Sequence, residues 1–425
     1  MFSFLSASKA LVKPAPVFFR HSVITGVLIS AFLTGFYSNA LAAKRNTDSV
    51  SSVSQPSGVN PDQLLIETYQ ALSNNQLNLA EQKIDALLAA YPNYQLAHLI
   101  RGDLLLMHTQ KVTGFGAMSH VPPDKLKELR DEAAARLKAI QFRPGPNQVP
   151  RSVLQLRDDQ KQVIVIDAKK SRLYLYDHLG AQQLQLRSDH YISQGKFGVD
   201  KLKEGDQKTP LGVYYITSRL SGSKLPDFYG PGALPLNYPN EWDKINGRSG
   251  SGIWLHGMPS SSFSRPPLAS DGCVVLTNPD FLNIAAQIEI GRTPVVIAEQ
   301  LEFTSREKLQ QERQQLAQVQ ESWRLDMESM NANRIFANYS RNFRSPQGED
   351  LNSWFAKQRP SWEGWSNPVV KLKDITQFRY PARDEMLVTT FTMELSSGRS
   401  HMSTRKRQYW IKEATKWRII YETNV

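Results

Sequence analysis

Cysteine is almost absent from this sequence, which holds one in 425 residues. A single thiol excludes an intrachain disulfide framework and any metal cluster built on several cysteines. Long apolar runs are also scarce, since only residues 23–37 approach the length of a membrane span. Apolar residues nevertheless make up 40% of the chain, which is enough for packed cores and excludes wholesale disorder. Cys273 is therefore either an inert structural side chain or a reactive thiol with a chemical role.

The first 42 residues have the composition of an export signal. Three basic residues precede the apolar run, no acidic residue occurs before Asp48, and Ala40-Leu41-Ala42 offers a small-residue cleavage site. We expect residues 1–42 to be a signal peptide, with an uncleaved N-terminal anchor as the alternative. Cleavage would lower the net charge from +11 to +8 and leave no stable transmembrane span. A lone thiol exported to an oxidising compartment suggests that the thiol is used.

Composition divides the rest of the chain into four segments. Residues 43–60 are polar and rich in serine, which predicts a linker. Residues 61–142 carry apolar side chains at helical spacing and predict a helical region that resembles a tetratricopeptide pair, with a plain helical bundle as the alternative. Residues 155–300 contain short strand-like runs. Residues 304–425 predict a long helix followed by a curved antiparallel sheet, an α+β arrangement.

Two stretches of the strand-rich segment are unusual. Residues 218–250 are rich in glycine and proline and lie between two predicted strands. A structureless loop of that length inside a compact domain is usually functional. Further on, a helix is predicted over 279–290, with Asn278 as its N-cap and Pro279 in its first position.

The single cysteine follows a histidine at a distance of seventeen residues. Only the thiolate is nucleophilic, so a catalytic Cys273 needs a partner that takes its proton, and His256 suits that role near neutral pH. His256 ends an apolar strand and precedes Gly257, which would fix its ring. The backbone amides of Gly272 and Cys273 could stabilise an oxyanion, and Gly272 would let a substrate approach closely. A buried structural cysteine is the alternative.

These residues resemble the signature of the L,D-transpeptidase (YkuD) catalytic domain. The resemblance begins with His256-Gly257 and Ser270-x-Gly272-Cys273. It extends to the Lys208-Thr209-Pro210-Leu211-Gly212 turn and to the segments at 236–240 and 247–257, and it covers residues 161–299 in all. It implies a mainly-β catalytic domain that acts on peptidoglycan in the periplasm.

The resemblance also implies roles for individual residues. Cys273 would attack the carbonyl at the L-centre of meso-diaminopimelate in a tetrapeptide stem, releasing the terminal D-alanine and leaving a thioacyl enzyme. His256 would be the general base and then the general acid, oriented by the backbone carbonyl of Gly257. Residues 218–250 would cover the donor peptide. The substrate would be bound by Ser270, Gly272 and Asp271. No metal or other cofactor is implied.

Several side chains do not follow the family pattern or have two interpretations. Val275 stands where many transpeptidases have arginine, and Asp271 stands where histidine or arginine is common. Asp271 could bind the diaminopimelate ammonium group, although a solvated loop acid is the simpler interpretation. Arg248 and Arg265 could meet a substrate carboxylate, but we favour a loop-surface charge for each.

The C-terminal segment resembles an NTF2-like domain. The resemblance rests on a helix containing Trp323, the segment at 335–339 and a closing strand at 417–421. The fold class is therefore multidomain: a helical TPR-like N-terminal region, a mainly-β YkuD domain and an α+β NTF2-like domain. This order looks like that of the L,D-carboxypeptidases that trim peptidoglycan tetrapeptides. We interpret most aromatic residues of the tail as core packing.

The sequence thus favours a periplasmic cysteine acyltransferase or peptidase whose partners are peptidoglycan stem peptides. Transpeptidation to an amine stands first. Trimming of tetrapeptide to tripeptide and hydrolysis of a protein–peptidoglycan link are alternatives with the same Cys273–His256 chemistry. A non-catalytic envelope-binding scaffold, contacting envelope proteins through the helical or NTF2-like parts, is the alternative of another class. Nucleic acid is not expected as a partner. We also expect Cys273 to react with thiol probes at mildly acidic pH.

Overall fold

A computed structural model describes residues 60–425, except 113, 118–120, 142, 363, 382 and 384. The expected signal peptide and all but the last residue of the expected linker lie outside this part of the chain. Among the described residues, no helix has both the length and the apolar character needed to cross a membrane.

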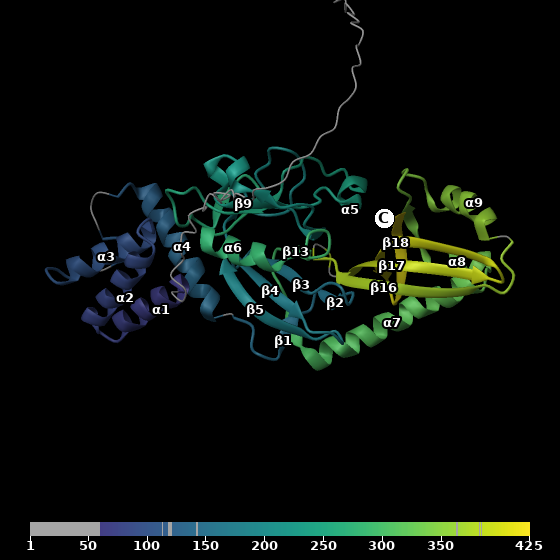
Figure 1. The fold of residues 1–425 in the computed structure, drawn as a ribbon, viewed down its shortest axis with the longest axis horizontal. Helices are drawn as coiled ribbons and strands as arrows, with labels where there is room; N and C mark the ends of the chain where they lie inside the picture. The colour runs from purple at the N-terminus through teal and green to yellow at the C-terminus, as the bar shows by residue number, and fades with distance from the viewer. Residues whose placement is uncertain are drawn as a thin grey trace, which may run out of the picture. The chain divides into compact units, whose positions relative to one another are not determined.

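The N-terminal region consists of helices, as the sequence predicts. They are α1 (Pro61–Ser73), α2 (Leu77–Ala90), α3 (Gln95–Met107) and α4 (Pro123–Gln141) (Figure 1). Asn60 caps α1 by accepting a hydrogen bond from the backbone amide of Gln63. Each of the first three helices buries one apolar stripe in a common core that includes Leu65, Ile84 and Leu104. Packing of these stripes, rather than helix propensity, stabilises the region.

A five-stranded sheet supports the domain that follows. Its strand order is β5-β4-β3-β13-β7. The strands are β3 (Gln162–Asp167), β4 (Arg172–His178), β5 (Leu184–Tyr191), β7 (Gly212–Tyr215) and β13 (Pro294–Ala298). The apolar run of β3 is buried on both faces of the sheet, which explains why its sequence shows no polar alternation.

A second, smaller sheet carries the histidine and lies next to the cysteine. Its order is β12-β10-β9-β8, with β8 (Leu220–Ser221), β9 (Gly232–Pro235), β10 (Trp254–His256) and β12 (Val274–Val275). β10 and β12 are parallel, with His256 opposite Val275. Cys273 directly precedes β12, so the pairing brings it beside β10. β6 (Gln194–Gly195) and β11 (Leu268–Ser270) form a further two-stranded pair.

The segment at 218–250 is not the structureless loop that its composition predicts. It contains β8, β9, two short 3₁₀ helices, η1 (Gly222–Lys224) and η2 (Asp227–Tyr229), and the helix α5 (Glu241–Ile245). Each of these elements spans only two to five residues, which is too short to produce a detectable periodicity. Their partners in the fold, rather than local sequence, determine their conformation.

The N-cap of α6 (Asn278–Gln287) is also different from the expected one. Thr277 caps this helix, because its side chain accepts a hydrogen bond from the backbone amide of Asp280. His190 of β5 lies with Nδ1 2.7 Å from Asp280 Oδ1, which ties the large sheet to the start of α6. The side chain of Asn278 is therefore available for a different contact.

The C-terminal domain is a long helix followed by a largely antiparallel sheet, as the sequence predicts, although the strand at one edge runs parallel to its neighbour. Its helices are α7 (Arg306–Glu328), α8 (Ala332–Phe336) and α9 (Leu351–Trp362). Its strands are β15 (Tyr339–Arg344), β16 (Val369–Arg379), β17 (Met386–Ser397), β18 (Ser400–Glu413) and β19 (Lys416–Asn424). β2 (Val153–Gln155) pairs with β16 at the edge of this sheet, and β1 (Gln148–Pro150) pairs with β14 (Phe303–Ser305). The chain therefore contacts this domain both before and after the catalytic strands.

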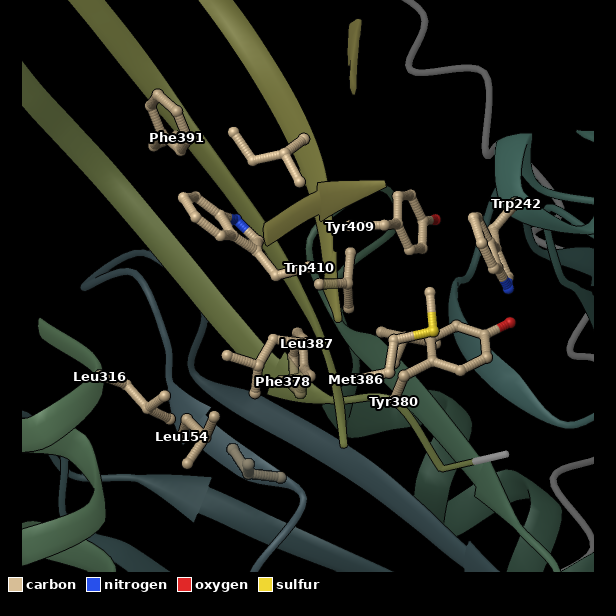
Figure 2. Close-up of a cluster of buried hydrophobic side chains, with 14 of the residues drawn as sticks. Leu154, Trp242, Leu316, Phe378, Tyr380, Met386, Leu387, Phe391, Tyr409 and Trp410 are labelled. Carbon is tan, nitrogen blue, oxygen red and sulfur yellow. The ribbon is translucent and has the colours of Figure 1, made fainter. Parts of the chain in front are cut away.

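The catalytic and C-terminal domains share one apolar core. Trp242 of α5 lies beside Tyr409 of β18, as Figure 2 shows. The two rings are stacked, with centroids 5.1 Å apart. Beside this stack, Arg407 donates to both carboxylate oxygens of Glu241 at 2.8 Å. Trp323 is fully buried against Phe391, which supports core packing as the role of this aromatic residue.

Candidate active site

The imidazole of His256 is oriented by the backbone of the next residue. His256 ends β10 and is 1% exposed. Its Nδ1 lies 2.7 Å from the carbonyl oxygen of Gly257. Because a carbonyl can only accept, Nδ1 carries the proton, and Nε2 keeps the lone pair that a general base needs.

Two features hold the Gly257 carbonyl in this position. A Cβ atom at Gly257 would lie 2.5 Å from Asn278 Oδ1 and 2.6 Å from Pro231 Cδ, so the position accepts only glycine without movement of its neighbours. Asn278 Oδ1 also accepts a hydrogen bond of 2.6 Å from the backbone amide of Met258. Asn278 is therefore a positioning residue that the sequence analysis assigned to helix capping alone.

A network of short hydrogen bonds shapes the turn that carries Cys273. Ser270 Oγ accepts from the Gly272 amide at 3.1 Å and donates to the Cys273 carbonyl at 2.6 Å. Thr209 Oγ1 donates to the Gly272 carbonyl at 2.9 Å. The Ser270 hydroxyl thus braces the turn rather than facing a substrate. The Lys208–Gly212 motif contains Thr209, but its sequence gave no indication of this contact.

Gly272 is required by the packing of the chain itself. Its φ is +125°, and a Cβ atom there would lie 2.7 Å from the carbonyl oxygen of Lys208. The Gly272 amide already donates its hydrogen bond to Ser270. Of the two backbone amides that could stabilise an oxyanion, the Cys273 amide therefore remains as the candidate.

Burial keeps both reactive groups neutral. It lowers the pKa of His256 to about 4. It raises the pKa of the Cys273 thiol above its ordinary value, although a hydrogen bond from the Trp254 amide partly opposes this. Cys273 Sγ lies 3.3 Å from the Gly252 carbonyl, which accepts the thiol hydrogen. A neutral thiol is a poor nucleophile towards probes, so the structure argues against the expected labelling at mildly acidic pH.

Two aromatic rings from the 218–250 segment cover the histidine. The centroids of Phe228 and Tyr229, both in η2, lie 5.7 Å and 5.1 Å from that of the His256 ring. Tyr229 also packs against Trp254 of β10 at 5.0 Å. This pair of aromatic residues within a glycine- and proline-rich stretch is the sequence signal from which the cover could have been predicted.

The charged side chains around the site have different surroundings. Asp271 is exposed and accepts from Gln207 Nε2 at 2.5 Å. Arg248 donates to the Lys201 carbonyl at 2.6 Å and to Asp200 Oδ1 at 2.7 Å, so it braces a loop within the domain. Neither arrangement brings the side chain to Cys273.

Arg265 differs from the loop-surface charge that the sequence favoured. It is partly buried, and its guanidinium carbon lies 5.4 Å from the centroid of Phe228, the ring that covers His256. The burial lowers the pKa of Arg265, while the nearby Cys273 and Asp271 act in the opposite direction. In the part of the chain that the structure describes, no cluster of three or more His, Cys, Asp or Glu side chains is arranged to hold a metal ion.

Comparison with known families matches two regions of the chain. The L,D-transpeptidase catalytic domain (YkuD) matches residues 161–297, and the Cds6 C-terminal NTF2-like domain matches residues 315–423. No curated protein matches the chain.

Two solved structures have a similar architecture. Bd1075 of Bdellovibrio bacteriovorus is 28% identical, with a TM-score of 0.57 over 65% of this chain and 98% of that one. The helical cell shape determining protein Pgp2 of Campylobacter jejuni is 22% identical, with a TM-score of 0.56 over 64% of this chain and 95% of that one. The resemblance noted in the sequence is therefore confirmed: the chain contains an L,D-transpeptidase (YkuD) catalytic domain preceded by a helical region and followed by an NTF2-like domain.

Proposed function

We propose that the protein is a periplasmic cysteine enzyme that trims peptidoglycan tetrapeptide stems to tripeptides through a thioacyl intermediate. The observation that carries the proposal is the bond between His256 Nδ1 and the Gly257 carbonyl, at 2.7 Å. It leaves Nε2 as the base for Cys273, which directly precedes β12, the strand that pairs with β10. A non-catalytic scaffold would have no need for this arrangement.

The two neutral groups can perform the acylation step directly. Cys273 Sγ attacks the carbonyl at the L-centre of diaminopimelate while its proton moves to Nε2 of His256. We expect the Cys273 amide to stabilise the oxyanion that forms. Collapse of this intermediate breaks the peptide bond, and the imidazolium gives its proton to the departing amine of D-alanine. The product is a thioester between Cys273 and the shortened stem.

The cover over His256 favours water as the acceptor. The base that must activate the acceptor is 1% exposed and lies beneath Phe228 and Tyr229. Water needs far less space to reach Nε2 than the amine of a second stem peptide does. Hydrolysis therefore takes precedence over transpeptidation, which the sequence analysis placed first. Transpeptidation is the second candidate, because it is the activity after which the matched domain is named.

The domain arrangement connects the proposal with cell shape. The structure named as a helical cell shape determining protein shares the fold over 95% of its length. Shortening of stem peptides removes donors for cross-links, which is a direct way to alter the form of a cell wall. We include a contribution to cell shape in the proposal on this basis.

Incubation of the purified protein with tetrapeptide muropeptides, with and without an amine acceptor, tests the proposal by mass spectrometry. Tripeptide and free D-alanine in both reactions support trimming. Cross-linked or exchanged products would show transpeptidation instead. The Cys273→Ala variant, shown to be folded by circular dichroism, serves as the control and must give no product. Absence of every product with folded wild-type protein would contradict an enzymatic role.

A further inference from the structure

Arg265 lies between His256 and Cys273 in the sequence, and the hydrogen bonds of its guanidinium group are weak. Nε of Arg265 is 3.1 Å from the sulfur of Met258, and Nη1 is 3.4 Å from the Ala269 carbonyl. Among the described residues, no ion pair with Arg265 is recorded. A guanidinium has five N–H donors, and a thioether and one distant carbonyl satisfy few of them. The group is therefore available to an anion.

The cost of this burial suggests that the anion is a ligand. Removing a charged group from water is unfavourable unless a counter-charge and hydrogen bonds replace the lost hydration. Arg172, a buried arginine of this domain, has such partners, since it donates to Asp62 at 2.7 Å and to Asp189 at 2.6 Å. Arg265 differs from Arg172 in this respect. Its positive charge also lowers the pKa of both Cys273 and His256, which places it within electrostatic reach of the reacting atoms.

The loop that carries Arg265 is firmly anchored to the helical region. Phe263 is inserted between Tyr91 and Tyr94, with ring centroids 4.5 Å from each. Ser264 Oγ accepts from Arg136 Nη2 of α4 at 2.8 Å. These contacts fix the backbone beside Arg265 before any substrate arrives, which reduces the entropy lost when the substrate binds.

The backbone of Arg265 itself is also held. Its carbonyl oxygen accepts from the hydroxyl of Tyr191, on β5, at 3.0 Å. With the backbone fixed from two sides, the guanidinium stays beside Phe228 rather than extending into solvent.

We propose that Arg265 binds a carboxylate of the stem peptide and thereby selects stems with a free carboxyl group. This inference rests on the proposed function and deepens it. A tetrapeptide stem offers two such groups near the scissile bond: the C-terminal carboxylate of the departing D-alanine and the side-chain carboxylate of diaminopimelate. Consecutive Cα atoms are about 3.8 Å apart, so a group one residue beyond the attacked carbonyl is within reach of a residue next to the site. Paired N–H donors of arginine match a carboxylate well.

The test compares three substrates and three arginine variants. The substrates are the tetrapeptide muropeptide with both carboxylates free, its C-terminal amide, and its diaminopimelate side-chain amide. The variants are Arg265→Gln, Arg265→Lys and, as a control, Arg187→Gln, which removes an exposed partner of Asp177 in the same domain. Release of the terminal residue gives kcat/KM for every combination, and thermal melts establish that each variant is folded.

We expect the wild type and the Arg187→Gln control to prefer one free carboxylate over its amide by on the order of 10- to 100-fold in kcat/KM, the range of a charged hydrogen bond. In Arg265→Gln, kcat/KM for the free-acid substrate should fall by that factor, while kcat/KM for the corresponding amide should not change. The kcat/KM of Arg265→Lys for the free acid should lie between those of the wild type and Arg265→Gln. The amidation that lowers kcat/KM of the wild-type enzyme identifies the carboxylate that Arg265 binds.

Two results would overturn the inference while leaving the proposed function intact. The first is wild-type turnover that is indifferent to both amidations. The second is an Arg265→Gln variant that slows acid and amide substrates by the same factor, because this would show a structural role only. If folded wild type turns over none of the three substrates, the proposed function itself fails and the inference fails with it.

Discussion

The chemistry of this site depends on two side chains that burial keeps neutral. A catalytic pair that rests as thiol and imidazole must move its proton during the attack rather than before it. The bond from His256 Nδ1 to the Gly257 carbonyl makes this possible, since it fixes the tautomer without a third acidic side chain. A neutral resting pair also protects the thiol from oxidation, because the thiolate is the form that reacts.

The pH dependence of the reaction follows from the His256 imidazole. Its pKa is about 4 in the folded protein, so the base is lost to protonation only below that pH. We expect kcat/KM for tetrapeptide trimming to rise through about pH 4 and to stay level across neutral pH, instead of falling near the ordinary histidine pKa of about 6.5. A pH–rate profile with its acidic limb near 6.5 would contradict a neutral pair in the free enzyme.

Replacement of Gly272 by alanine should abolish activity. The new Cβ atom would lie 2.7 Å from a backbone oxygen at a residue with φ of +125°. The turn must then shift, which moves the adjacent Cys273, and we expect kcat/KM to fall more than about 100-fold. Gly291→Ala is the matched control, because Gly291 also has positive φ, +74°, but has nothing within 4 Å of the added atom. It should cost about 1 kcal/mol of stability and retain activity. Equal loss of activity in both variants would contradict the steric argument.

At the scale of elements, the short 3₁₀ helix η2 packs on the histidine of the candidate site. It presents two aromatic rings to His256 from a segment that also contains β8 and β9 of the same small sheet. Desolvation by burial is the largest cause of the low histidine pKa, and these rings are among the groups that pack on His256. The cover therefore affects both the proton affinity of the base and the choice of acceptor.

Removal of the cover should change both properties together. In the Phe228→Ala and Tyr229→Ala variants, water reaches His256, so its pKa should rise from about 4 towards 6.5, and the acidic limb should move to higher pH. The same variants should form more amine-exchange product relative to tripeptide when an amine acceptor is present. Leu179→Ala, which truncates an exposed apolar side chain elsewhere in the domain, should change neither value. Unchanged product ratios in both cover variants would argue against a steric choice of acceptor.

The first turn of α6 also positions part of the candidate site. Asn278 fixes the Met258 amide at 2.6 Å and packs against Gly257. Asn278→Ala should leave the Gly257 carbonyl less well oriented, and we expect kcat to fall by roughly 10-fold with little change in KM. Asn283→Ala is the control, because this residue lies on the same helix and bonds only to Gln287. Similar kinetics for both variants would contradict a positioning role for Asn278.

At the scale of the whole described molecule, the flanking regions hold the two segments that form the site. α5, in the covering segment, docks on the C-terminal sheet through Trp242. The loop that carries Arg265 docks on the N-terminal helices through Phe263. Each flanking region therefore holds one segment of the candidate site in place by packing.

This arrangement predicts a remote effect of Phe263. Phe263→Ala removes a buried ring and should cost about 3 kcal/mol of unfolding free energy. It should also lower kcat/KM about 10-fold under conditions where the variant is folded, because the Arg265 loop loses its anchor. Leu65→Ala empties the same core away from the loop and should destabilise the protein without changing kcat/KM. Denaturant unfolding and kinetics on both variants measure the two effects. Equal kcat/KM in both variants would contradict the anchoring role.

The sequence by itself determined the nucleophile candidate, the histidine partner and the order of the three regions. Each of these is local information: a lone cysteine, motifs of a few residues, and apolar periodicities long enough to distinguish helix from strand. The last strands of the C-terminal domain, β17, β18 and β19, were predictable because they run for nine to fourteen residues. The short elements at 218–250 were not, since no periodicity develops over so few positions.

Only the tertiary structure decided which side chains surround the reacting atoms. Asn278, Thr209 and Phe228 reach the site from separate segments, and Arg265 turns inward because Phe263 is buried among helices more than 150 residues earlier in the chain. The tertiary structure also determines the protonation states of Cys273 and His256, because their pKa values depend on burial by residues that are distant in the sequence. Contacts and desolvation between segments far apart in the chain leave no periodic trace in the sequence, so only the folded arrangement determines them.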